Sequence, residues 1–272
     1  MLLDVIKKRK SVRTFSPEPL EDAHRIHLES HLESIGEGPF RHVSRIMDAP
    51  AADGNDEGQQ IGTYGVIKGQ QGYLVGICRP SRESLMDLGY NMQGAVLLLS
   101  SLGIGTCWLG GTFKRSDIKD YVDLEDDEGI AAVIPYGYPA EKARVIEGLM
   151  KKAAGSSKRR AFNELFTVAE EADEGVFECL EAVRLAPSSM NNQPWRAVVD
   201  GRGIHLFMAL PGRIRVEAGL NMRYLDIGIA MYHLEGVCKE SFGCVGWEND
   251  ERGSQLGGQG TEYVATLKIG KG

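Results

Sequence analysis

The chain has 272 residues, 42% of them hydrophobic and 25% charged, so it can bury a large core as one or two domains. Its 38 acidic residues outnumber its 31 basic ones, and the net charge of −7 gives no general field for holding nucleic acid or an anionic membrane. We expect no secretory signal. No apolar run approaches the roughly 18 residues of a membrane span. The five cysteines contain no C-x-x-C pair. We therefore expect a cytoplasmic protein with reduced thiols and no bound metal.

In chain order, the first feature is a basic cluster formed by Arg9, Lys10, Ser11 and Arg13. A helix is predicted over residues 21–34, and the i, i+4 spacing of two of its three histidines could chelate a metal. These histidines flank an apolar stripe, so a helix face at a domain border is the better interpretation.

A polar, glycine-rich stretch at 48–60 predicts a surface loop. A strand is then expected at 73–80, a long buried helix from Met86, a glycine-containing segment at 103–111 and a strand from 130. After a charged linker at 148–160, a strand at 203–210, a long helix from Leu225 and a strand from 263 repeat this order.

The two long helices match without a gap at a constant spacing of 139 residues. The matched pairs are Asp87 with Asp226, Gly89 with Gly228, Met92 with Met231 and Trp108 with Trp247. Collinear matches pair residues 39–43 with 194–198 and 130–139 with 263–272, and a much weaker match pairs 9–15 with 159–166. We interpret the chain as two tandem copies, residues 1–150 and 151–272.

Each motif that could bind a ligand is intact in only one copy. The first copy carries the basic cluster, and the second carries the loop with Pro187, Ser188, Ser189 and Asn191. Two copies packed as a pseudo-dimer could therefore form one working site across their interface, while the second, symmetry-related site has lost its motifs.

The motifs together suit a flavin mononucleotide. The cationic groups of Arg9, Lys10 and Arg13 suit a phosphate, with the Ser11 hydroxyl as a further contact. The hydroxyls and amides at 187–192 suit a polyol or the edge of a heterocycle. The glycines at 103–111 let the backbone approach a flat ring, and because this segment follows a helix, a Rossmann dinucleotide site is rejected.

These motifs, with residues 134–144, resemble the FMN-dependent nitroreductase family, and the tandem arrangement resembles its fused, internally duplicated TM nitroreductase branch. The resemblance implies an α+β protein with a layered α/β/α sheet, in which two tandem copies pack as a pseudo-dimer that can be monomeric. It implies FMN binding by these residues: Arg9, Lys10, Ser11, Arg13, Leu109, Gly110, Gly111, Lys142, Arg144, Pro187, Ser188, Ser189 and Asn191.

The same resemblance implies a ping-pong reaction. NAD(P)H would deliver hydride to flavin N5, and an electron-poor small molecule such as a nitroaromatic or a quinone would then take it. A backbone N–H of the 109–111 segment would lie near N5, while Lys142 and Arg144 would close over the phosphate. Arg13 would have the catalytic role of stabilising the negative charge that reduction places around N1 and the C2 carbonyl.

Two alternatives stay open at this point. The chain could bind flavin or another small ligand without turnover, or it could be a flavin dehydrogenase for a different small metabolite, because a fold does not dictate a function. Trp108 and Trp247 are expected to be core residues because both copies keep them, and Cys107 is expected to be a packed residue and not a redox thiol.

Overall fold

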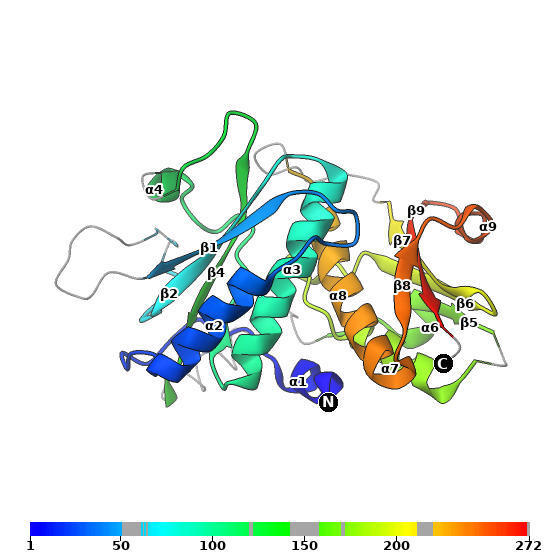
Figure 1. Cartoon of the computed structure of the whole chain (residues 1–272), viewed down its shortest axis with the longest axis horizontal. Helices are drawn as coiled ribbons and strands as arrows, with labels where there is room; N and C mark the ends of the chain where they lie inside the picture. The colour runs from blue at the N-terminus through cyan, green and yellow to red at the C-terminus, as the bar shows by residue number, and fades with distance from the viewer. Residues whose placement is uncertain are drawn as a thin grey trace.

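A computed structural model describes residues 1–50, 61, 63, 65–119, 122–141, 158–169, 172–210 and 220–270 (Figure 1). Its helices are α1 (Leu2–Lys8), α2 (Asp22–Ser34), α3 (Arg82–Ser101), α4 (Ser116–Lys119), α6 (Phe162–Leu165), α7 (Glu174–Arg184), the 3-10 helix η2 (Ser189–Asn191), α8 (Met222–Phe242) and α9 (Glu251–Ser254). Its strands are β1 (Ser44–Pro50), β2 (Gly72–Cys78), β3 (Gly105–Thr106), β4 (Gly129–Gly137), β5 (Phe166–Val168), β6 (Trp195–Asp200), β7 (Gly203–Ala209), β8 (Val245–Glu248) and β9 (Thr261–Ile269).

The strands form two sheets whose order repeats. The first sheet has the order β1-β2-β4-β3, and the second has β6-β7-β9-β8 with β5 added in parallel beside β6. All other neighbouring strands are antiparallel, and the β2–β4 and β7–β9 pairs each contain one shift of register. Each half thus contains a hairpin, a long helix, a short edge strand and a returning strand, which is the α+β class predicted from the sequence.

The two long helices pack against each other between the two sheets (Figure 1). Ser81 caps α3 by accepting a hydrogen bond from the Ser84 N–H, and Asn221 caps α8 in the same way from Arg223. Both helices are buried along most of their length, as expected of helices at the centre of a molecule.

Two glycines allow the close approach of α3 and α8. A Cβ on Gly89 would lie 2.2 Å from the Leu225 carbonyl oxygen, and a Cβ on Gly228 would lie 1.9 Å from that of Met86. The contact is reciprocal, because both pairs are matched at the same spacing of 139 residues. Such mutual contact is the geometry of a two-fold interface.

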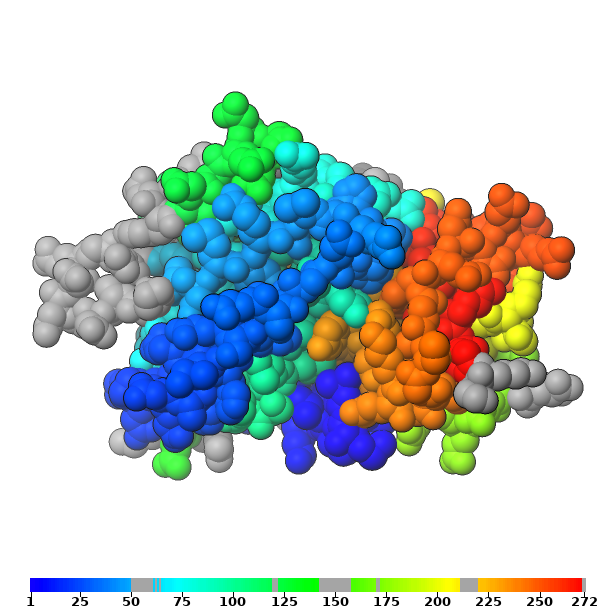
Figure 2. Space-filling view, in the orientation of Figure 1, coloured from blue at the N-terminus to red at the C-terminus, as the bar shows by residue number. Residues whose placement is uncertain are grey.

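Three apolar clusters fill the molecule. One lies between the first sheet and helices α2 and α3, a second covers the other face of that sheet, and the third joins the second sheet to α7 and α8. Leu3 and Ile6 of α1 belong to this third cluster, so the first helix of the chain packs with the second copy. Figure 2 shows the two halves meeting side by side over a broad front.

Several elements differ from their predicted form. Strands β1 and β6 precede the predicted strands, and Asp48 to Pro50, expected in a loop, belong to β1 because they pair with β2. The pairing of residues 39–43 with 194–198 does not fit the strands, since Pro194 directly precedes β6 whereas Pro39 lies five residues before β1. Among the helices of the described ranges, none is both long and apolar enough to cross a membrane.

Candidate functional site

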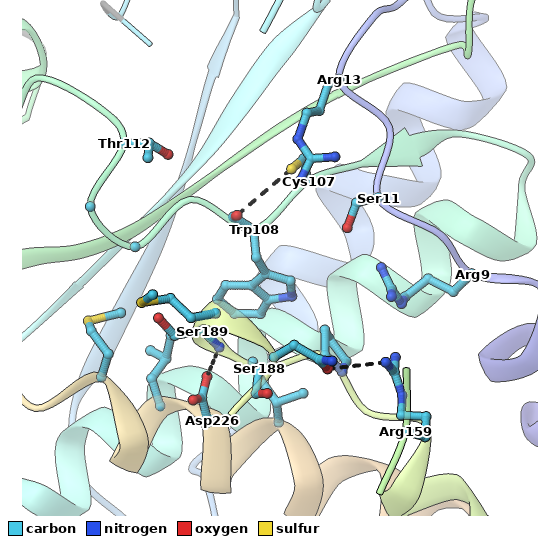
Figure 3. A pocket seen from close by; sticks show the side chains of 18 residues that line it. Arg9, Ser11, Arg13, Cys107, Trp108, Thr112, Arg159, Ser188, Ser189 and Asp226 are labelled. Atoms are coloured by element: carbon cyan, nitrogen blue, oxygen red, sulfur yellow. Dashed lines mark hydrogen bonds between the residues drawn. The ribbon is translucent and has the colours of Figure 1, made fainter. Parts of the chain in front are cut away.

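A cavity of about 490 Å³ lies where the two halves meet (Figure 3). Its walls come from the segment after α1, the segment after β3, the loop around η2 and the start of α8. The lining residues are Arg9, Ser11, Arg13, Cys107, Trp108, Gly110, Gly111, Thr112, Arg159, Pro187, Ser188, Ser189, Met190, Asn191, Met222, Leu225, Asp226 and Ile229.

Main-chain pairing brings the first two segments together. The Val12 N–H donates to the Thr106 carbonyl over 2.9 Å, and Ser11 forms a bridge with Thr106. The basic cluster therefore runs beside the segment 107–112 although nearly a hundred residues separate them. Lys10 is exposed and is not among the lining residues.

Guanidinium groups dominate one side of the cavity. Figure 3 shows Arg9 and Arg159 facing each other across its right-hand end, and Arg13 near Cys107 above Trp108. Burial, with a further contribution from the positive charge of Arg159, lowers the pKa of Arg9 to about 10. No carboxylate of the described residues pairs with Arg9, so this end of the cavity is suited to an anion.

The loop at 187–193 is held in an uncommon backbone conformation. Met190, Asn191 and Gln193 have φ values of 51°, 55° and 49°, in the left-handed region that residues other than glycine rarely adopt. The Ser188 Oγ accepts from the Gln193 N–H over 2.9 Å, and Asn191 donates to the Lys158 carbonyl over 2.8 Å. Such strain is typical of functional loops.

Asp226 of α8 anchors this loop. Its Oδ1 accepts from the Ser189 N–H over 2.9 Å, whereas its buried Oδ2 has no hydrogen-bond partner among the described residues. Burial raises the pKa of Asp226 to about 8. Its matched residue Asp87 has both oxygens occupied, by the N–H groups of Phe40 (2.9 Å) and His42 (2.8 Å).

A buried chain of hydrogen bonds orients Trp108. The indole Nε1–H donates to Gln93 Oε1 over 3.1 Å, which directs the Gln93 amide nitrogen to His233 Nε2 at 2.8 Å. His233 Nδ1 lies 2.7 Å from the Ala182 carbonyl, so it carries the proton and Nε2 accepts. Burial lowers the pKa of His233 to about 3, which keeps the ring neutral. The chain of bonds links α8, α3 and the cavity wall.

Trp108 was expected in the core, and it does pack on two core clusters, but it is only half-buried and also lines the cavity. Its matched residue Trp247 instead donates to Glu235 over 2.7 Å and is not among the lining residues. Cys107, expected to be packed, is buried and also reaches the cavity.

The structure separates the three predicted residues of the 109–111 segment. Gly110 and Gly111 line the cavity, and a Cβ on Gly110 would lie 3.0 Å from the Met222 methyl group. The Leu109 side chain is buried, and its N–H donates to the Val133 carbonyl over 2.9 Å. Leu109 therefore cannot present its N–H to a ligand in the cavity without breaking this pairing, and Gly110 and Gly111 remain the candidates.

The other predicted residues fall into two groups. Ser11, Arg9 and Arg13 from the first copy and Pro187, Ser188, Ser189 and Asn191 from the second meet in the one cavity. Lys142 and Arg144 lie outside the described residues. Arg159 and Asp226 were missed as site residues, although the sequence pairs them with Arg9 and Asp87.

Comparisons with known proteins agree with the resemblance read from the sequence. The model of the family described as "Putative TM nitroreductase" matches residues 1–237, and no curated protein sequence matches the chain. A solved "putative nitroreductase" from Thermotoga maritima MSB8 is similar at 18% identity with a TM-score of 0.63, and the match covers 98% of this chain and 93% of that one. This likeness shows a shared fold over nearly the full length of both chains.

Two shorter structures match at lower TM-scores. A "putative nitroreductase in complex with FMN" from Desulfovibrio desulfuricans has 20% identity and a TM-score of 0.44, covering 60% of this chain and 93% of its own. A nitroreductase with bound FMN from Bacteroides fragilis NCTC 9343 has 15% identity and a TM-score of 0.40, covering 52% and 89%. Because the family model spans 237 of the 272 residues, the chain belongs to the TM nitroreductase family.

Proposed function

We propose that the chain is an FMN-dependent NAD(P)H oxidoreductase of nitroreductase type, which passes hydride to an electron-poor small molecule such as a nitroaromatic or a quinone. Membership of the nitroreductase family supports the reaction class. The observation that carries the cofactor assignment is Arg9, a partly buried arginine that lines the cavity and has no carboxylate partner in the described parts of the chain.

The cavity fits FMN in size and chemistry. Its volume of about 490 Å³ lies within the range of about 300–1,000 Å³ that is usual for small-molecule and cofactor sites. Guanidinium groups at one end suit a phosphate, and the Ser188 and Ser189 hydroxyls suit a polyol. Gly110 and Gly111 leave room for a flat ring beside Trp108. Bound FMN would supply a ring that accepts hydride from NAD(P)H and gives it up again.

The protein residues would bind and orient, and they would stabilise charge. Arg13 lies beside Cys107 and Trp108, at the part of the cavity that we assign to the flat ring (Figure 3). A fixed cation there favours negative charge on a ring at that place. The strained loop at 187–191, anchored on Asp226, would present its hydroxyl and amide groups from the second half.

We propose further that residues 1–150 and 151–272 are two copies fused into one functional pseudo-dimer, with α1 crossing to the second copy. The repeated strand order and the reciprocal contacts of Gly89 and Gly228 support this arrangement. A chain that already contains both halves needs no second subunit to complete the site. The five free cysteines, four of them buried, fit the reducing cytoplasm where NAD(P)H is available.

The absorption spectrum of the purified protein tests the cofactor, recorded under argon before and after addition of NAD(P)H. If the protein is colourless, FMN is added first and unbound flavin is removed. We expect a flavin band at about one equivalent per chain that bleaches with the reduced nicotinamide. Failure to bind FMN, with the protein shown to be folded, would overturn the proposal.

Turnover is tested by NAD(P)H oxidation with a quinone and with a nitrofuran. Oxidation that requires an acceptor supports the proposed reaction. Reducible flavin without turnover of either acceptor would instead favour a flavin dehydrogenase for another metabolite, and flavin that NAD(P)H cannot reduce would favour a binding protein.

A further inference from the structure

Arg159, from the second half of the chain, lines the same cavity as Arg9. The sequence comparison pairs these two arginines at a spacing of 150 residues, and the structure places both in one site. Figure 3 shows their guanidinium groups on the same side of the cavity, with Ser11 and the loop of Ser188 beside them. Two matched residues of the repeat therefore serve one cavity.

Neutral acceptors hold the Arg159 side chain in place. Its Nη1 donates to Asn191 Oδ1 over 3.2 Å and to the Lys158 carbonyl over 3.3 Å, and its Nη2 donates to the Leu185 carbonyl over 3.2 Å. Carbonyl and amide oxygens orient a guanidinium without neutralising its charge. Asn191 thus helps to fix the position of the Arg159 side chain at the cavity wall.

The two guanidinium groups repel each other in a partly desolvated site. The charge of Arg159 helps to lower the pKa of Arg9, and burial lowers the pKa of Arg159. Like charges brought together away from water cost free energy unless an opposite charge lies between them. An anion with several acceptor oxygens can accept hydrogen bonds from both guanidinium groups at once.

We propose that Arg9 and Arg159 form a two-arginine clamp for a phosphate group, with Asn191 as the residue that positions Arg159. This inference rests on the proposed function, since FMN carries the phosphate that we assign to the clamp. The phosphates of a nicotinamide dinucleotide share this chemistry, so the test must separate the two ligands. The clamp draws one arginine from each copy, which explains why the second copy keeps Arg159 although Asn163 stands where the first copy has Arg13.

The test is the variant Arg159→Gln, titrated with FMN and with riboflavin, which lacks the phosphate. Loss of one charge-assisted contact is expected to weaken FMN binding by about 10- to 100-fold and to leave riboflavin binding within about twofold. Arg159→Lys keeps the charge but not the fork and should show a smaller loss. Flavin fluorescence on titration gives each dissociation constant.

Arg160→Gln is the matched control. Arg160 is the neighbouring arginine, its side chain is half-exposed and lies 3.9 Å from Glu164, and it is not a lining residue of the cavity. The control should bind both flavins as the wild type does. Equal losses of FMN and riboflavin in Arg159→Gln, or no loss of FMN, would overturn the assignment to FMN.

Two further arms separate failure of the clamp from failure of the proposed function. Inorganic phosphate should raise the melting temperature of the flavin-free wild type more than that of Arg159→Gln, and equal shifts would overturn the clamp whether or not FMN binds. NADPH is titrated against both flavin-free proteins. Unchanged FMN affinity with weakened NADPH binding would overturn FMN as the ligand and assign the clamp to the dinucleotide.

Discussion

Asp226 offers the sharpest test of the physical description of the site. Because its pKa in the fold is raised to about 8, the native protein holds a proton there at pH 5 to 7, whereas an unfolded aspartic acid, with a pKa near 3.9, has lost it. Unfolding therefore releases one proton over this range. The free energy of unfolding must then fall by about 1.36 kcal/mol per pH unit through this group alone, so stability is lost as the pH rises.

Asp226→Asn removes this dependence and keeps an acceptor for the Ser189 N–H. From pH 5 to pH 7 the free energy of unfolding of the variant should rise by about 2.7 kcal/mol relative to that of the wild type. For a chain of this size the gain corresponds to a relative rise in melting temperature of about 5 to 10 °C. All other titrating groups are common to both proteins, so the difference between the two curves isolates Asp226.

The assay is calorimetric melting of both proteins at pH 5, 6 and 7. Asp87→Asn is the control, because both Asp87 oxygens accept backbone N–H groups and the amide would turn a donor toward one of them. That change should cost about 1–3 kcal/mol at pH 5, and because burial also raises the pKa of Asp87, the cost should become smaller as the pH rises. Parallel curves for the wild type and Asp226→Asn would show that Asp226 is ionised in the fold and would refute the reasoning.

Further outcomes follow from the helix contact and the cavity wall. Gly228→Ala should cost about 3 kcal/mol or more in urea unfolding, because its Cβ would lie 1.9 Å from the Met86 carbonyl oxygen, whereas Gly94→Ala meets only a ring edge at 3.0 Å and should be nearly neutral. Equal effects would contradict this account of the α3–α8 contact. Trp108→Phe removes the indole donor from a buried amide and should lower stability by about 1–3 kcal/mol in the same assay. Arg13→Ala should weaken FMN binding and slow flavin reduction by about 10- to 100-fold in titration and stopped-flow measurements, and unchanged values would remove Arg13 from the site.

The fold was predictable where the sequence has long buried elements. The two long helices, their matched glycines and the strands beside them follow from apolar runs and from the constant spacing of 139 residues. Strand β1 could not be predicted, because Asp48 to Pro50 become strand only through pairing with β2. The crossing of α1 is a matter of tertiary packing, since Leu3 and Ile6 would fit any apolar surface.

The site was predictable in its parts and not in its details. Motifs split between the copies indicated a cavity built from both halves, and nine of the predicted residues line it. Sequence could not show that the Leu109 N–H pairs with Val133, because that pairing depends on the register of a neighbouring strand. It could not show either that Trp108 lies at the cavity, since the sequence treats Trp108 and Trp247 alike and only their hydrogen-bond partners differ.

Residues at matched positions have different roles in the two halves. Asp87 and Asp226 both hold the loop before the first hairpin, but Asp87 uses two oxygens and Asp226 only one. Burial raises the pKa of both carboxyls, but the two N–H donors at Asp87 oppose the rise, whereas Asp226 has one donor and a bare buried oxygen and its pKa is raised to about 8. Selection for stability alone would favour the first arrangement at both positions. The unsatisfied oxygen lies in the half whose loop faces the cavity, so we infer that the loop geometry required by the site, and not the stability of the second half, determines the environment of Asp226.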